Sequence, residues 1–179
     1  MSSEKIPLLP FQLVLIAAVI ALPFAGSAIV VHLFSRAGAS SGSDTALVHV
    51  LAILSVLVPA FLMLAIVSRR TVTFTPDGLT IRHGFYTVQL TAGAQRIARV
   101  EVVDSPDRIR IQLKSNGIAA FGLYSGWFIA ASAPCFCAIS SSPICVLQVE
   151  GHPRCRMIAF SCTPAMVERV RKWQVALSA

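Results

Sequence analysis

Residues 71–82 read TVTFTPDGLTIR, and at this stretch the chain changes from continuously apolar to alternating. Apolar residues alternate with polar ones on both sides of the tripeptide Pro76-Asp77-Gly78. A two-residue period is typical of a strand with one buried face. Proline presets φ and glycine accepts a positive φ, so the tripeptide predicts a tight turn. The stretch therefore predicts a β-hairpin that opens a β-rich domain, with His83 exposed in the turn that follows.

The same period continues downstream and predicts a mainly β barrel or sandwich, because many short strands in about 90 residues are typical of those folds. Residues 108–114 alternate without a break. They predict one strand with Leu113 on its apolar face and Arg108, Arg110 and Lys114 on its basic face. Further strands are expected at residues 86–90, 98–103, 127–131, 134–139, 144–150 and 155–160.

The chain ends in a predicted amphipathic helix at about residues 164–177. Thr163 is a good N-cap, and Pro164 occupies the first helical position. Met166 and Val170 recur at helical spacing, which gives the helix one apolar stripe. Such a helix either closes one end of a barrel or packs on a sheet face, and both alternatives stay open.

Two long apolar stretches precede the β domain. Residues 11–34 and 46–67 contain no Asp, Glu, Lys or Arg. A helix of about 20 apolar residues crosses the hydrocarbon core of a bilayer. The sequence therefore predicts two transmembrane α-helices in a hairpin within residues 1–69, followed by the β domain at 70–179. For the first stretch, a cleaved signal peptide is the alternative.

Composition and charge agree with a membrane protein. Hydrophobic residues make up 55% of the 179-residue chain and charged residues only 13%, whereas soluble domains are about 25% charged. This balance excludes a disordered chain and a coiled coil, and argues against an ordinary soluble enzyme. The segment between the apolar stretches contains one Lys or Arg residue, Arg36, whereas Arg69 and Arg70 follow the second stretch. The positive-inside rule then predicts that both termini are cytoplasmic.

Two segments of the β domain resemble a known family. TFTPDGLTI at residues 73–81 resembles the opening hairpin of bacterial pleckstrin-homology (PH) domains. GLYSGWF at residues 122–128 resembles the Gly-Tyr-x-x-Gly-Trp-Phe stretch of a membrane-anchored PH-like family, with Leu123 inserted after the first glycine. That family commonly carries an N-terminal helical hairpin. The resemblance implies a PH-like barrel with one C-terminal helix, in a multi-pass protein of the bacterial inner membrane that serves interaction or assembly.

The five cysteines all lie in the C-terminal half of the chain and include no CxxC pair. Zinc sites usually show such pairs. We therefore expect reduced, buried thiols. Disulfides and a metal cluster that uses His152 and Cys155 are the alternatives.

No catalytic signature is present. The sequence lacks the phosphate-binding, dinucleotide-binding, zinc-protease and serine-hydrolase motifs. We therefore predict a protein that is not an enzyme and that needs no cofactor and no metal. A Cys155–His152 nucleophile is a remote alternative.

Two groups of residues are the candidates for binding. The first is basic and consists of Arg69 and Arg70 with the basic face described above. Each such cation contributes about 1 kcal/mol near an anionic leaflet, although a merely solvated face is the alternative. The second group is aromatic, Tyr124 and Trp127, which either bind a partner or lipid or fill the core.

The predicted function is that of a non-enzymatic interaction or assembly module at the cytoplasmic membrane. Its predicted partners are the lipid bilayer and other membrane proteins or further copies of the chain. The alternative is a sensor of anionic lipid headgroups. Nucleic acid is not expected, because the basic stretches lack interleaved aromatic residues.

Overall fold

The computed structural model divides the chain into two compact units, one formed by residues 1–9 and 68–179 and the other by residues 10–67. We call the first of these the β unit. Its N-terminal nine residues lie far from its remainder in the sequence, so the predicted boundary at residue 70 misses them. The described residues are 2–36, 47, 50, 51, 53–55, 57, 58, 61, 68–120 and 122–178.

The prediction of two transmembrane helices is wrong. Helix α1 (Pro10–Arg36) overlaps the first apolar stretch, but residues 46–67 are described only at isolated positions. The second predicted helix therefore lies for the most part outside the described residues. Within them, no helix combines the length and the apolar character that crossing a membrane requires. The predicted multi-pass inner-membrane location with cytoplasmic termini depended on these two helices, so that prediction is wrong as well.

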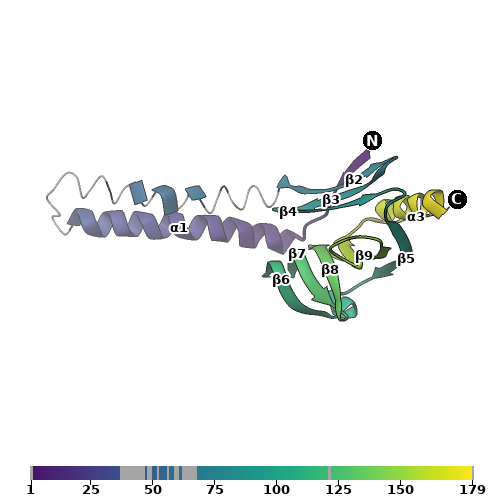
Figure 1. Cartoon of the computed structure of the whole chain (residues 1–179). Coiled ribbons are helices and arrows are strands. Elements are labelled where there is room, and N and C mark those ends of the chain that lie inside the picture. Colours follow the sequence, from purple (N-terminus) through teal and green to yellow (C-terminus); the bar gives the residue numbers. More distant parts are fainter. Residues whose placement is uncertain are drawn as a thin grey trace. The chain divides into compact units, whose positions relative to one another are not determined.

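Sheet A contains four antiparallel strands in the order β1-β2-β3-β4 (Figure 1). The predicted hairpin forms its centre, with Val72 opposite Ile81 and Phe74 opposite Leu79. Because the side chains alternate, the apolar ones of β3 and β4 face the core. The strands are β1 (Ser2–Lys5), β2 (Arg70–Thr75), β3 (Gly78–His83) and β4 (Tyr86–Thr91).

Sheet B contains six strands in the order β5-β9-β10-β8-β7-β6. Strand β10 runs parallel to β8, and the other neighbours are antiparallel. The short 3-10 helix η1 (Pro106–Ile109) joins the two edge strands of this sheet. The strands are β5 (Arg96–Val103), β6 (Ile111–Ala120), β7 (Leu123–Ala130), β8 (Ala133–Ile139), β9 (Ile144–Glu150) and β10 (Met157–Ser161).

Both faces of sheet B are buried at its centre. On one face, Phe136 and Phe160 pack with the apolar side chains of sheet A and of the C-terminal helix. On the other face, Phe128 and Cys137 belong to a second cluster that includes Ile109 of η1. Strands buried on both faces are near-continuously apolar, which explains why β8 and β9 contain so few polar residues.

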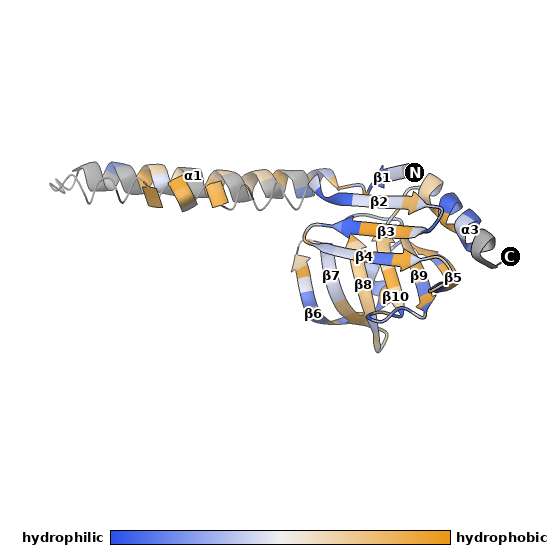
Figure 2. Cartoon of the chain, turned by 45° about the horizontal axis from the view of Figure 1, so that its top comes forward, coloured by the Kyte–Doolittle hydropathy of each residue, from blue (hydrophilic) through white to orange (hydrophobic). Residues whose placement is uncertain are grey.

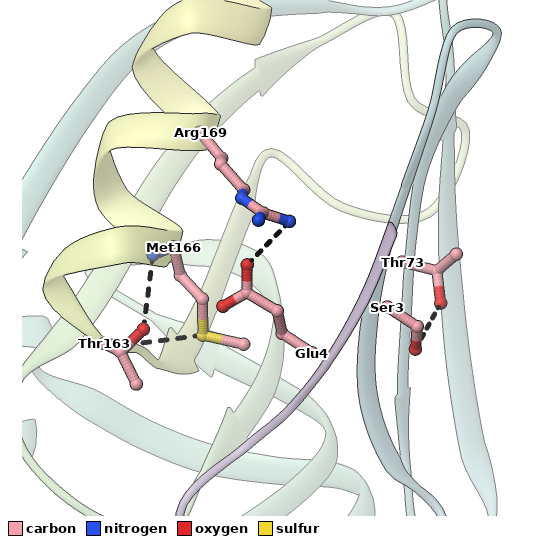
Figure 3. Close-up of polar contacts among 6 residues, drawn as sticks. All are labelled: Ser3, Glu4, Thr73, Thr163, Met166 and Arg169. Carbon is pink, nitrogen blue, oxygen red and sulfur yellow. Dashed lines mark hydrogen bonds and ion pairs between the residues drawn. The ribbon is translucent and has the colours of Figure 1, made fainter. Parts of the chain in front are cut away.

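Helix α3 (Pro164–Ser178) begins as the sequence predicts, because the backbone N–H of Met166 donates to Thr163 Oγ1 over 3.3 Å. Its buried residues Met166 and Val170 join the core between the sheets. An ion pair of 2.9 Å between Arg169 and Glu4 links the helix to β1 (Figure 3). The N-terminal strand is thereby held by the last element of the chain.

A buried serine fixes the connection between β8 and β9. Ser161 Oγ accepts the backbone N–H groups of Ser140 and Ser141, over 2.9 and 2.7 Å, and donates to the carbonyl of Ser141. All three serines are buried. Two donors of a tight connection therefore depend on one hydroxyl group.

We expect Ser161→Ala to lower the free energy of unfolding by about 2 kcal/mol, because it leaves two buried N–H groups without an acceptor. Urea unfolding of the full chain measures this difference. Ser142→Ala is the matched control, since Ser142 is exposed and its hydroxyl donates to the carbonyl of Asp104. Equal losses in the two variants would contradict the assignment.

Candidate interaction surface

The predicted basic strand face is interrupted at its start. Arg108 belongs to η1, and Arg110 caps that helix with φ and ψ of 54° in the left-handed region. Only Lys114 lies on β6, where it is exposed opposite Phe128 of β7. The three cations therefore follow one another along η1 and β6 but do not share a strand face.

Strand β6 also departs from the predicted alternation. Its register with β7 shifts between Ile111 and Leu113 and again between Lys114 and Asn116. Each shift inserts an unpaired residue and turns the following side chains to the other face. As a result, Leu113 is 63% exposed, although the sequence predicts it on the apolar face.

The outer edge of β6 is unpaired within the described residues. Sheet B ends at this strand, which has ten residues and is the longest of the four edge strands. The opposite edge, β5, is covered in part, since Gln174 of α3 donates to the carbonyl of Ile97 and Arg99 pairs with Glu101. Figure 2 shows β6 at the margin of the sheet, with hydrophilic and hydrophobic segments along it. Lys114 is its only charged residue.

The predicted aromatic residues divide between the two faces of β7. Trp127 is only 9% exposed and packs edge-to-face on Phe136, with ring centroids 5.1 Å apart. The guanidinium group of Arg154 covers the other side, 4.3 Å from the ring centroid. Tyr124 is half-buried and packs edge-to-face on Phe128 at 5.9 Å. Trp127 therefore belongs to the core, and Tyr124 lies at the margin of the second cluster.

Arg69 and Arg70 both bond other segments of the β unit, Arg70 through its side chain and Arg69 through its backbone carbonyl. Arg70 Nη1 donates to the carbonyl of Ile6 over 2.9 Å, and the carbonyl of Arg69 accepts the N–H of Gly84 over 2.8 Å. Arg70 lies opposite His83 in the register of β2 and β3. The side chain of Arg69 is exposed.

The prediction of an exposed His83 is wrong. Its side chain is 0% exposed, and neither ring nitrogen has a hydrogen-bond partner among the described residues. Burial, and to a smaller extent the nearby charge of Arg70, lowers the pKa of His83 to about 4. The residue closes the end of β3, where Ser125 of β7 donates to its carbonyl over 2.9 Å. The sequence contains no signal for the burial of His83, because a residue next to a turn is usually exposed to solvent.

All five cysteines are free and buried, which confirms the expected reduced thiols. Sγ atoms of Cys135 and Cys137 lie 3.6 Å apart on one face of β8. The hydrogen bond from Cys137 and burial both raise the pKa of Cys135. The thiol of Cys135 is therefore protonated and unreactive. Among the described residues, no group of three or more His, Cys, Asp or Glu side chains is arranged to hold a metal ion.

Cys155 and His152, the remote alternative for a nucleophilic pair, are in contact but are not in the charged forms that catalysis needs. Cys155 Sγ lies 3.2 Å from His152 Nδ1. Burial raises the pKa of Cys155 to about 12, and burial with the charge of Arg154 lowers the pKa of His152. Both shifts favour the neutral pair, whereas a nucleophilic cysteine needs a thiolate beside an imidazolium.

No protein-family model, curated protein or solved structure matches the chain significantly. The resemblance to bacterial PH domains thus stays a prediction, and the function of the chain has to be argued from the geometry above.

Proposed function

We propose that the β unit is a non-enzymatic interaction module whose β6 edge accepts an extended segment of a partner protein. The observation that carries this proposal is the unpaired ten-residue edge with an exposed Leu113. An exposed strand edge offers a row of backbone donors and acceptors, and an extended peptide satisfies them by adding one strand to the sheet.

Charge favours an acidic partner over a second copy of the chain. Arg108 and Arg110 precede β6, Lys114 lies on it, and the whole chain carries a net charge of +7. Two such chains repel each other, whereas acidic side chains that flank an apolar residue complement the cations and Leu113. The alternative of a lipid-headgroup sensor is less well supported, because the continuous basic face that it needs is interrupted at Arg110.

Synthetic peptides test the proposal on the full chain. We expect an acetylated peptide of alternating Glu and Val to slow amide hydrogen exchange in β6 severalfold, and the Lys–Val peptide to have no such effect. Lys114→Glu should weaken the Glu–Val peptide about fivefold, in line with the loss of one charge pair near a surface. Lys172→Glu on α3 is the matched control, since Lys172 is also exposed.

Three results would contradict the proposal. They are protection of β4 or β5 in place of β6, equal binding of both peptides, and equal effects of the two lysine variants. Protection of β6 that grows with protein concentration in the absence of peptide would assign the edge to a second copy instead.

A further inference from the structure

A groove of about 690 Å³ lies at one end of sheet B, and the residues that line it do not belong to β6. Its wall is formed by β5, by the turn between β7 and β8 and by the hairpin of β9 and β10. Small-molecule sites have volumes of about 300–1,000 Å³. Three of the residues that line the groove are alanines, Ala98, Ala131 and Ala133, whose small side chains leave it open.

One wall of the groove is strained. The turn between β7 and β8 places Ala131 at φ 47° and Ser132 at φ 65°. Two-residue hairpin turns of this kind strongly prefer Asn-Gly, because each left-handed residue with a Cβ costs about 1 kcal/mol. Strain of this kind clusters at ligand-binding sites. Here it brings only a methyl group of Ala131 to the groove.

The groove carries one unpaired cation on a fixed backbone. The N–H of Arg156 donates to the carbonyl of Pro134 over 2.9 Å, and its carbonyl accepts the N–H of Val149 over 2.8 Å. The guanidinium group of Arg156 is exposed and makes no ion pair with any described residue. A guanidinium group is suited to bind a carboxylate through two parallel hydrogen bonds.

His152 adds a neutral donor beside this cation. Its Nδ1 accepts the backbone N–H groups of Arg154 and Cys155, over 3.2 and 3.1 Å. These bonds place the ring proton on Nε2, on the opposite side of the imidazole. His152 lines the groove, and the Nε2–H is the hydrogen-bond donor that its ring has.

Acceptors complete the site. Gln148 and Glu150 also line the groove, and as alternate residues of β9 they point to one face of the sheet. Glu150 makes no ion pair within the described residues. Among the lining residues, Arg156 and Glu150 carry opposite charges, and Arg96 lies opposite Glu150 in the register of β5 and β9.

We propose that this groove binds a zwitterionic ligand with a small apolar body, which is the chemistry of a free apolar amino acid. The ligand carboxylate bonds Arg156 and the Nε2–H of His152, and its ammonium group bonds Glu150. Its side chain lies against Met157 and the alanines. This site is independent of the β6 edge, so each can fail without the other.

Calorimetric titration of the full chain with L-leucine tests the assignment. We expect saturable binding that Arg156→Gln weakens at least tenfold and that Ala98→Leu abolishes by filling the groove. Arg99→Gln is the matched control, because Arg99 is an exposed arginine on β5 that does not line the groove. Circular dichroism confirms that each variant is folded.

Analogues separate the two charges of the ligand. We expect 4-methylpentanoate, which lacks the ammonium group, and isoamylamine, which lacks the carboxylate, each to bind at least tenfold more weakly than L-leucine. Equal binding of either analogue, equal effects of Arg156→Gln and Arg99→Gln, or no saturable binding of L-leucine would overturn the proposal. Competition by inorganic phosphate at equal concentration would also overturn it, since that result assigns a simple anion site.

Discussion

We expect Gly126→Ala to lower the free energy of unfolding of the chain by about 4 kcal/mol. Gly126 has φ +118°, and a Cβ atom there would lie 2.5 Å from the carbonyl oxygen of Asn116 and 2.7 Å from Cα of Gly117. Both are backbone atoms of β6, so no side-chain rotation relieves the clash. The substitution has to separate β6 from β7 or distort both strands.

Gly122→Ala is the matched control for this substitution. Gly122 also has a positive φ, +75°, but a Cβ atom there meets nothing within 4 Å. It should cost about 1 kcal/mol, which is the backbone term alone. Urea unfolding of both variants separates strain from steric overlap. Equal stability of the two variants would contradict the close approach of β6 to β7 at Gly126.

His83 should make the stability of the chain depend on pH. Its pKa is about 4 in the folded protein, against 6.5 for the exposed group. As the pH falls, the unfolded chain therefore binds this proton first. The stability is complete above pH 6.5 and is lost progressively between pH 6.5 and 4, by about 3 kcal/mol from this residue.

The variant His83→Leu removes the proton-binding group and keeps a side chain of similar size. We expect its free energy of unfolding at pH 7 to be no lower than that of the wild type, because neither ring nitrogen makes a hydrogen bond that would be lost. Between pH 6.5 and 4 it should lose about 3 kcal/mol less than the wild type. His152→Gln is the control, since that ring is half-exposed. Parallel pH profiles for wild type and His83→Leu would refute a buried, uncharged His83.

The local pattern predicted the β2–β3 hairpin and the start of α3 correctly. Both depend on neighbouring residues, the turn at Pro76-Asp77-Gly78 and the cap at Thr163, so a short window contains the whole signal. The burial of the cysteines was also predictable, because a small apolar thiol without a nearby ligand partner usually packs in a core. The membrane hairpin failed, since it was inferred from composition over two stretches and the described residues do not contain it.

The β6 edge and the groove could not be predicted from the sequence. The alternation in residues 108–114 is unbroken in the sequence, yet Arg110 adopts a left-handed conformation and β6 carries two register shifts. The first feature arises where η1 ends and the second from pairing with β7, and the alternation of the window encodes neither. The groove likewise draws on β5, the β7–β8 turn and the β9–β10 hairpin, and no contiguous motif marks it.

By itself, the sequence determined the elements whose cause is local, namely the alternating strands, their turns and the capped C-terminal helix. Only the tertiary structure decided which strand stands at the edge of sheet B, that β10 pairs in parallel with β8, and that the first residues of the chain form a strand beside β2. It also decided that His83 is buried and that Arg156 is left without an acidic partner among the described residues. The physical reason is that edges, parallel pairs and burial depend on which distant segments meet, and hydrophobic periodicity reports only which face of a segment is apolar.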